Sequence, residues 1–146
     1  LPPDTNHHGT AFGGKIMQWM DVAAGIAAAR HGRKPVVTLS VDDLHFARPI
    51  RLGDVVVLTA SVNHTGRTSM EVGVRVDREN PITRQHEHCL TGYFTFVAVD
   101  EAGKPQPIAP VEPETPDEQR RFEDAARRRE QRLERARRRQ ERDRES

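Results

Sequence analysis

Apolar residues occupy almost every side of a helix drawn over residues 13–31, and not a single stripe along it. The segment opens on two glycines, Gly13 and Gly14. Its last turn carries the basic residue Arg30, and Gly32 lies just beyond it. These residue types are typical of helix ends. We predict one helix of about five turns, ~28 Å long at roughly 1.5 Å per residue. Because it is apolar nearly all round, we expect it to be buried on most sides.

Four later segments have the β-branched content or the period-two alternation of strands: 36–46, 55–64, 68–78 and 88–100. The third alternates strictly, with polar or small residues between the apolar positions Met70, Val72, Val74 and Val76. The connections are too short for the crossovers that parallel strands need, so the sheet should be antiparallel. The 13–31 helix is the apolar element available to cover it. We therefore expect an α+β fold with an antiparallel sheet curled around a central helix.

The C-terminal part of the chain follows a different pattern. Residues 104–116 are proline-rich and extended, and from 117 onward opposite charges recur four residues apart, as expected on a helix: Glu123 with Arg127, Asp124 with Arg128, and Glu134 with Arg138. We favour a solvated or frayed helix. A contact with a partner or nucleic acid is the alternative, which the interspersed acids and the single aromatic residue weaken. We divide the chain into a domain over 1–110, a proline-rich linker over 111–116 and a charged helical tail over 117–146.

Composition refines this picture. The chain has 146 residues, a length that suggests one domain. Hydrophobic residues make up 35 % of it, which is low for a globular chain. Residues 117–146 hold 12 arginines and 9 acids, which leaves 11 basic and 13 acidic residues of the totals of 23 and 22 in the rest. The body is mildly acidic and the tail basic. The single cysteine, Cys89, excludes an internal disulfide, and no signal peptide or membrane-spanning run is visible. We expect a cytoplasmic protein.

Asp21 is the acid most suggestive of chemistry, because it lies inside the apolar helix between Met20 and Val22. An acid so placed either interacts with the helix dipole or acts as a general base or nucleophile in an apolar pocket. The dipole effect has mostly decayed two turns into a helix. We therefore favour the catalytic interpretation.

The two glycines at the helix start also have two interpretations. Gly13 and Gly14 are either packing glycines or a helix start whose free N–H groups receive a carbonyl oxygen. Gly13 precedes Asp21 by eight residues, which is about 12 Å along the helix axis. One reacting carbonyl cannot touch both. If both act, they come from different subunits, which predicts a dimer with sites at its interface.

The remaining candidates for chemistry are weaker. His86 and His88 share a strand face but lack an obvious third ligand, so we expect no metal site. Cys89 is most simply a core residue. Ser40 and Ser69 lack the Gly-x-Ser-x-Gly context of an esterase, and no dinucleotide or P-loop motif is present.

Arg67 lies in the segment Thr-Gly-Arg-Thr-Ser. It is either a plain turn residue or a phosphate ligand, with the hydroxyls of Thr68 and Ser69 beside it. The spacing alone does not separate these alternatives.

Four blocks in fixed order now carry a resemblance to a known family: PPDTNHHGTAFGGKIMQWMD, VVTLSVDDLHFARPIRLGD, TGRTSMEV and TGYFTFVAVDEAGKP. From about residue 2 to residue 110 they resemble the cytosolic acyl-CoA thioester hydrolases of the hotdog fold. The resemblance implies a sheet wrapped around the central helix, side-by-side dimers and commonly a trimer of dimers. It implies a thioesterase that hydrolyses acyl-CoA to free fatty acid and CoA, with no cofactor besides the CoA of the substrate.

The same resemblance assigns roles to individual residues. Asp21 matches the family's catalytic aspartate, and Asn6 matches its second catalytic position, in the loop before the glycines. Gly13 and Gly14 match the helix start that receives the thioester oxygen. The residues matching the segment close to CoA are those of the turn, Arg67, Thr68 and Ser69.

The mechanism and two rival functions stay open at this point. Asp21 either activates a water or attacks the thioester directly to give a mixed anhydride, and the acyl chain length is not predicted. A hotdog enoyl-CoA hydratase would carry a D-x-N-P-x-H loop, where residues 4–8 read DTNHH. A non-catalytic acyl-CoA-binding protein is the other rival, against which the presence of both Asn6 and Asp21 argues.

Overall fold

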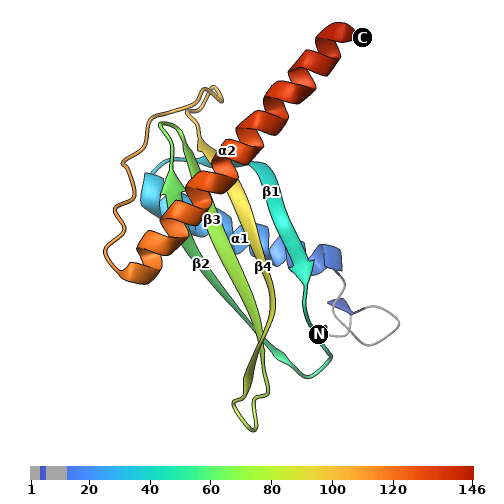
Figure 1. Ribbon diagram of the computed structural model, residues 1–146. Helices are drawn as coiled ribbons and strands as arrows, with labels where there is room; N and C mark the ends of the chain where they lie inside the picture. Colours follow the sequence, from blue (N-terminus) through green and yellow to red (C-terminus); the bar gives the residue numbers. More distant parts are fainter. Residues whose placement is uncertain (1–3, 6–12) are drawn as a thin grey trace.

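The fold is that of a computed structural model, which describes residues 4–5 and 13–146. Figure 1 shows a first helix against one face of a sheet and a second helix crossing the other face. In chain order the elements are α1 (Gly13–Gly32), β1 (Val36–Phe46), β2 (Val55–Thr65), β3 (Ser69–Glu79), β4 (His86–Ala98) and α2 (Pro116–Glu145). The predicted helices and four strands are thus confirmed, with ends shifted by two residues at most.

The strands form one antiparallel sheet in the order β1-β4-β3-β2, as the short connections predicted. Thr38 pairs with Phe96, Phe96 with Met70, and Met70 with Thr65, so these four residues lie in one row across the sheet. Strands β1 and β2 are the edges of the sheet within the described part of the chain. Because β1 follows α1 directly, the helix and this edge strand lie close together.

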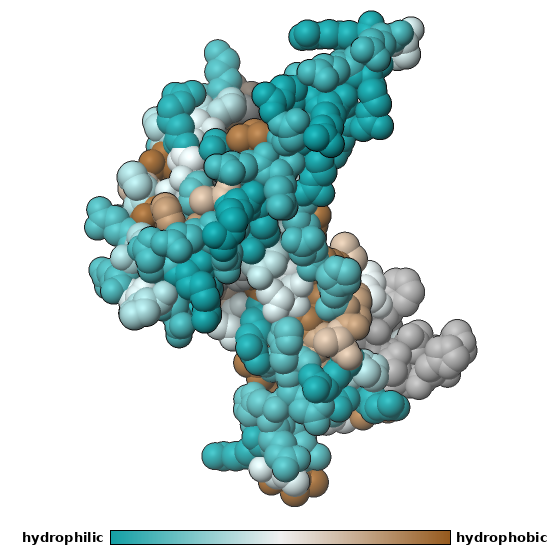
Figure 2. Space-filling view, in the orientation of Figure 1, coloured by the Kyte–Doolittle hydropathy of each residue, from teal (hydrophilic) through white to brown (hydrophobic). Residues whose placement is uncertain are grey.

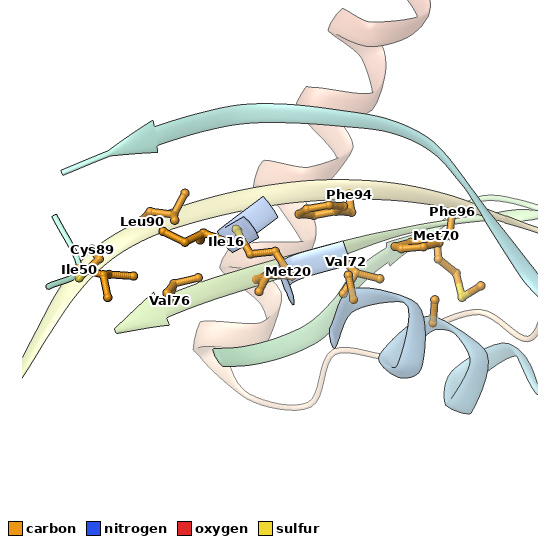
Figure 3. Close-up of a cluster of buried hydrophobic side chains, with 13 residues drawn as sticks. Ile16, Met20, Ile50, Met70, Val72, Val76, Cys89, Leu90, Phe94 and Phe96 are labelled. Atoms are coloured by element: carbon orange, nitrogen blue, oxygen red, sulfur yellow. The ribbon is translucent and has the colours of Figure 1, made fainter. Parts of the chain in front are cut away.

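The core lies between α1 and the inner face of the sheet (Figure 3). The alternating residues of β3 predicted for this face are fully buried, and Leu90, Phe94 and Phe96 of β4 join them. The part that α1 contributes is narrower than expected, since the side chains it buries form one stripe: Ile16, Met20, Ala24 and Ala28. The expectation that the helix is buried on most sides is wrong for a single protomer, because one sheet covers only one side of a helix.

The end of α1 is set by close packing. Gly32, expected just beyond the helix, is its last residue, and a Cβ there would lie 3.3 Å from both Ile108 and Met70. The left-handed residue that follows is Arg33, with φ of 53°, and its N–H donates to the Ala29 carbonyl at 2.7 Å. Glycine at position 32 therefore allows the proline-rich segment to approach the helix closely.

Residues 99–115, here called the strap, join the sheet to α2 and are held by hydrogen bonds to other parts of the chain. The Ile108 N–H donates to the Arg67 carbonyl at 3.0 Å, and the Val111 N–H donates to Thr65 Oγ1 at 3.0 Å. His31 Nε2 lies 2.8 Å from the Ala109 carbonyl oxygen. The strap thus bonds to the end of α1 and to the β2–β3 turn before the chain turns into α2.

Helix α2 begins at a capped N-terminus. Thr115 Oγ1 accepts a hydrogen bond from the Glu118 N–H at 3.1 Å, and Pro116 occupies the first helical position. Both features favour a helix start at this point. The local sequence therefore determines where α2 begins.

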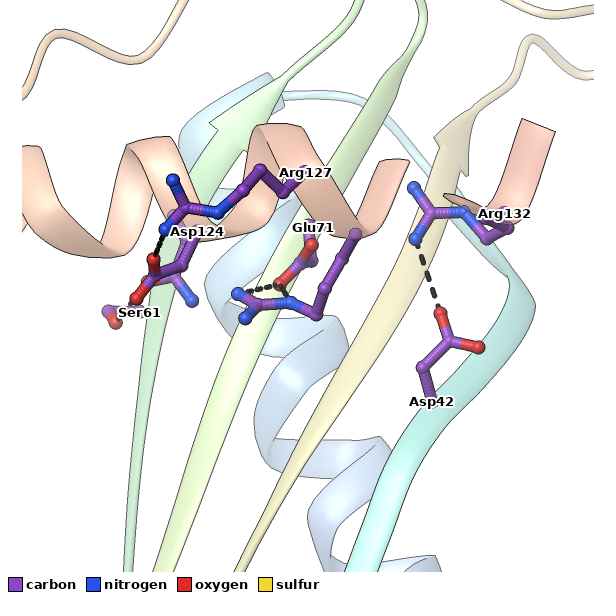
Figure 4. Close-up of polar contacts among 8 residues, drawn as sticks. Asp42, Ser61, Glu71, Asp124, Arg127 and Arg132 are labelled. Atoms are coloured by element: carbon purple, nitrogen blue, oxygen red, sulfur yellow. Dashed lines mark hydrogen bonds and ion pairs between the residues drawn. The ribbon is translucent and has the colours of Figure 1, made fainter. Parts of the chain in front are cut away.

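The first half of α2 packs on the outer face of the sheet, contrary to the expectation of a solvated or frayed helix (Figure 4). Arg128 donates to the buried Glu71 of β3 at 2.7 and 3.0 Å, and Arg132 donates to Asp42 of β1 at 3.2 Å. From Leu133 onward nearly every residue is exposed, so the solvated interpretation holds for the second half only.

The charge pairs within α2 also differ from those expected. The pairing of Glu134 with Arg138 is confirmed at 3.3 Å. Asp124 instead binds Arg127, because Arg128 turns toward the sheet. Over the residues that the structure describes, neither helix is long and apolar enough to span a membrane.

Candidate active site

Asp21 projects from the middle of α1 toward the edge strand β1. Its Oδ1 accepts a hydrogen bond from the Thr38 hydroxyl at 2.7 Å. The Thr38 hydroxyl donates its single proton in this bond and so orients the carboxylate. The second carboxylate oxygen, Oδ2, remains available to another group. Asp21 is partly buried in the protomer.

Thr38 is a site residue that the sequence analysis missed. It lies in a run of strand-forming residues, where a threonine is ordinary. No local signal distinguishes it, because its partner is 17 residues earlier in the chain. Only the packing of α1 against β1 brings the two side chains together.

The two elements that carry this pair, α1 and β1, leave several apolar side chains exposed in the protomer. Val22 of α1 is 57 % exposed, and Val37 and Leu39, on either side of Thr38, are 50 % and 65 % exposed. Other exposed apolar side chains of the same two elements are Met17, Ile26, Val41 and Phe46. Exposed apolar side chains on two neighbouring elements are typical of a protein interface.

The glycine pair lies at the other end of this region. Gly13 and Gly14 form the first turn of α1, and a Cβ on Gly13 would lie 3.8 Å from the Phe46 ring, at the far end of β1 from Thr38. Asp4 binds Lys15 at 3.5 Å beside this turn. The structure therefore separates the glycines from Asp21 within a protomer. Asn6 lies outside the described residues.

The turn from Gly66 to Thr68 joins β2 to β3, and Ser69 begins β3. Thr65, close before this turn, lies in the same row of the sheet as Thr38, the partner of Asp21. Three strand spacings, or about 14 Å, separate Thr65 from Thr38. Arg67 is exposed, with its carbonyl bound by the strap. The structure does not bring these residues together with Asp21 in one protomer. Their role as CoA ligands stays a prediction.

The two histidines named as the best metal pair have separate partners. His88 Nε2 lies 2.7 Å from the Thr91 hydroxyl, and His86 Nε2 lies 3.6 Å from Glu79. Among the residues that the structure describes, no three acids, histidines or cysteines are grouped as metal ligands. Cys89 is fully buried, and burial raises the pKa of its thiol, so it packs as a core residue.

Comparison with known proteins places this fold and site in context. Residues 8–84 match the family model of the thioesterase superfamily. A Bacillus subtilis relative, the uncharacterized acyl-CoA thioester hydrolase YkhA, is 47 % identical over 81 % of this chain and 69 % of its own length. The mouse cytosolic acyl coenzyme A thioester hydrolase is 38 % identical over 84 % of this chain but only 33 % of its own length.

Solved structures of acyl-CoA hydrolases share the fold of this chain. An apo-hexameric acyl-CoA thioesterase superposes with a TM-score of 0.89 at 47 % identity, covering 93 % of this chain and 87 % of its own. The acyl-CoA hydrolase of Staphylococcus aureus, solved with butyryl coenzyme A and coenzyme A, superposes with a TM-score of 0.90 at 38 % identity over 97 % of this chain and 86 % of its own. Further structures of that hydrolase carry alanine in place of an aspartate, a threonine or an asparagine.

An antiparallel sheet packed on a central helix is the hotdog arrangement, and the solved hydrolases share it. The chain belongs to the thioesterase superfamily, among the acyl-CoA thioester hydrolases. The predicted family and fold class are thereby confirmed.

Proposed function

We propose that this protein hydrolyses acyl-CoA to a free fatty acid and coenzyme A. The observation that carries the proposal is the Thr38–Asp21 hydrogen bond at 2.7 Å, in a chain closely related to named acyl-CoA hydrolases. A carboxylate oriented in this way is a general base or nucleophile in place before substrate arrives. Family membership favours thioester hydrolysis over the hydratase and binding-protein alternatives.

The residue spacing of the Staphylococcus aureus hydrolase supports the assignment of individual roles. The asparagine, aspartate and threonine replaced in its structures follow one another at intervals of 15 and 17 residues. Asn6, Asp21 and Thr38 have the same order and the same intervals here. Asp21 thus acts as base or nucleophile, Thr38 orients it, and Asn6 orients the carbonyl or the water.

The site is shared between two subunits. The open edge of β1 and the exposed apolar residues beside Asp21 are suited to pairing with a second copy of the chain. Antiparallel pairing about a two-fold axis would bring Gly13 and Gly14 of one subunit toward Asp21 of the other. Named relatives are hexameric, which fits a trimer of such dimers.

The remaining parts of the proposal concern CoA and the cell. The turn formed by Arg67, Thr68 and Ser69 binds the phosphates or the pantetheine arm of CoA, reached from a neighbouring subunit. No metal or redox cofactor takes part, since a carboxylate and a water suffice for hydrolysis. A cytoplasmic location is consistent with the cytosolic mouse relative.

The test is CoA release from a panel of acyl-CoAs by the wild type and by Asp21→Asn. We expect turnover by the wild type and a loss of roughly 10²-fold or more in the variant, the scale of a positioned base. Asp43→Asn makes the same chemical change at an exposed position on β1 and is the matched control. Thr38→Val should lower kcat less, because the carboxylate stays but loses its orientation.

Two outcomes would contradict the proposal. Equal turnover by the wild type and Asp21→Asn would exclude Asp21 as the base. No release from any acyl-CoA by a folded oligomer would favour a binding protein, and hydration of enoyl-CoA would favour the hydratase.

A further inference from the structure

A hollow lies on the opposite side of the sheet from Asp21, between α2 and the outer face of the sheet. It has a volume of about 440 Å³, within the range of small-molecule sites. Its walls come from α2 and its floor from β2, β3 and β4. Figure 2 shows this side of the molecule, where hydrophilic side chains predominate over α2. Most of the residues that line the hollow are polar or charged.

The lining of the hollow is dominated by hydrogen-bond donors. Four arginines contribute to it, three from α2 and one from β3: Arg120, Arg121, Arg128 and Arg75. Hydroxyl groups of the floor come from Thr59, Ser61, Thr91 and Tyr93. One acid, Asp124, also lines it, and its carboxylate is bound by Arg127. The ligand that such a lining favours is rich in acceptor oxygens and negatively charged.

The ion pairs of these arginines leave donors unused. Arg75 binds Asp77 through Nε alone, at 2.9 and 3.1 Å, so its two terminal amino groups have no partner among the described residues. Arg128 binds Glu71 through Nε and Nη2, which leaves Nη1. Arg121 makes no ion pair with any residue that the structure describes. Several guanidinium N–H groups therefore remain for a ligand.

The floor of the hollow is shaped by a glycine and an asparagine. A Cβ on Gly73 would lie 2.6 Å from Asn63 Nδ2 and 3.6 Å from the Tyr93 ring, so a side chain there would collide with the amide. Asn63 is only 5 % exposed, and its Oδ1 accepts from the Ser61 hydroxyl at 3.1 Å. This bond leaves the Asn63 NH₂ group as the donor, without a hydrogen-bond partner among the described residues. Asn63 lines the hollow, so its NH₂ group is a donor available to an acceptor there.

We propose that this hollow binds a phosphorylated compound through Arg121, Arg75, Arg128 and the Asn63 amide. Planar guanidinium groups match phosphate oxygens in pairs, and the volume accommodates more than one phosphate. The ligand is either a free phosphorylated metabolite or the phosphoadenosine end of coenzyme A reaching from another subunit. The site faces away from Asp21, so pyrophosphate binding to it can be measured whether or not Asp21 is catalytic.

Calorimetric titration with inorganic pyrophosphate tests the proposal. Arg121→Glu places a negative charge in the hollow and should weaken binding at least tenfold. Arg139→Glu makes the same change on the exposed distal part of α2 and should alter binding less than twofold. Arg67→Glu is a second control, because it removes the arginine proposed to bind CoA phosphates at the β2–β3 turn. Pyrophosphate binding in the hollow should not change in this variant. Circular dichroism and Tm of each variant show whether it is folded.

Titration of the same variants with adenosine 3′,5′-bisphosphate and with coenzyme A distinguishes the two sources. If Arg121→Glu weakens pyrophosphate but not coenzyme A, and KM for acyl-CoA is unchanged, the ligand is a free phosphorylated compound. If it also weakens coenzyme A and raises KM, the ligand is the nucleotide end of the substrate.

Two results would overturn the site. One is the absence of pyrophosphate binding by the wild type, and the other is equal binding by the wild type and a folded Arg121→Glu. Asp21→Asn should bind pyrophosphate like the wild type, so failure of the proposed hydrolysis would leave this measurement interpretable.

Discussion

The two faces of the sheet are covered by helices of opposite character. On the inner face α1 buries a stripe of four apolar residues against the sheet. On the outer face α2 buries only Ala125 completely, and two ion pairs join it to the sheet, Arg128 with Glu71 and Arg132 with Asp42. Both helices lie on the same strands, but the inner contact depends on apolar area and the outer contact on matched charges.

The inner contact supplies stability, whereas the outer contact fixes how α2 is aligned on the sheet. Burial of apolar area is favourable wherever it occurs, so the inner face stabilises the fold without needing one particular partner. A buried ion pair gains little over an apolar pair of the same shape, but it tolerates only one alignment. Tyr93 strengthens that alignment, since the Arg128 guanidinium lies 3.6 Å from its ring centre.

The largest effect should come from the inner face. Phe94 is 1 % exposed in the centre of the core, so Phe94→Ala should lower the free energy of unfolding by about 3–5 kcal/mol. Urea unfolding at fixed protomer concentration measures it. Ile82→Ala, at a position 91 % exposed, is the control, expected within about 0.5 kcal/mol of the wild type. Equal loss in both variants would contradict the assignment of the core.

The next effect tests the outer ion pair. Arg128→Met leaves the buried Glu71 carboxylate without its partner and should lower the free energy of unfolding by about 3 kcal/mol. The double variant Glu71→Leu with Arg128→Met removes both charges and should recover most of that loss. A double variant as unstable as the single one would show that the pair itself stabilises the fold, and the contrast between the two faces would fail.

A smaller effect is expected at the start of α2. Thr115→Ala removes the side-chain acceptor of the Glu118 N–H and should cost about 1 kcal/mol. Because the cap serves α2 alone, hydrogen exchange should accelerate in the first turn of α2 and not in α1. Acceleration in both helices would mean that the two faces unfold as one unit. Thr115→Ser, which keeps the hydroxyl, is the control.

The smallest effect concerns pH and α2 docking. His64 lies 4.8 Å from the Phe122 ring of α2, and burial, with Arg129 and Arg132 nearby, lowers its pKa. A base whose pKa is lowered in the folded state contributes stability above its ordinary pKa near 6.5. That stability is lost as pH falls through the lowered pKa. Urea unfolding between about pH 7 and 5 should therefore show a steeper acid loss for the wild type than for His64→Gln.

Much of the fold could be predicted from local pattern. The alternation of β3 identified the face that is buried in the core, because apolar residues at every second position all lie on one face of a strand. The exposed side of α1 could not be predicted, since its apolar residues run nearly all round and the pattern does not say which of them meet the sheet. Sequence alone also could not pair Arg128, which has Asp124 one turn away but binds Glu71, 57 residues earlier.

The candidate site divides in the same way. Asp21 was conspicuous because an acid inside an apolar helix is unusual. Thr38 was not, since a threonine in a strand is ordinary and only its contact with α1 gives it a role. The outer hollow was likewise hidden, because Asn63, Gly73 and Arg121 come from three elements whose meeting no local pattern encodes.

The amino-acid sequence by itself determined the elements, the antiparallel sheet, the family and the acid at its centre. These depend on periodicity, short connections and residue types, which are properties of neighbours along the chain. Only the tertiary structure decided that Thr38 holds Asp21, that α2 docks through Arg128 and Arg132, and that a donor-lined hollow lies beneath it. Hydrogen bonds and ion pairs act over a few ångströms, so their partners are fixed only when distant segments are packed together.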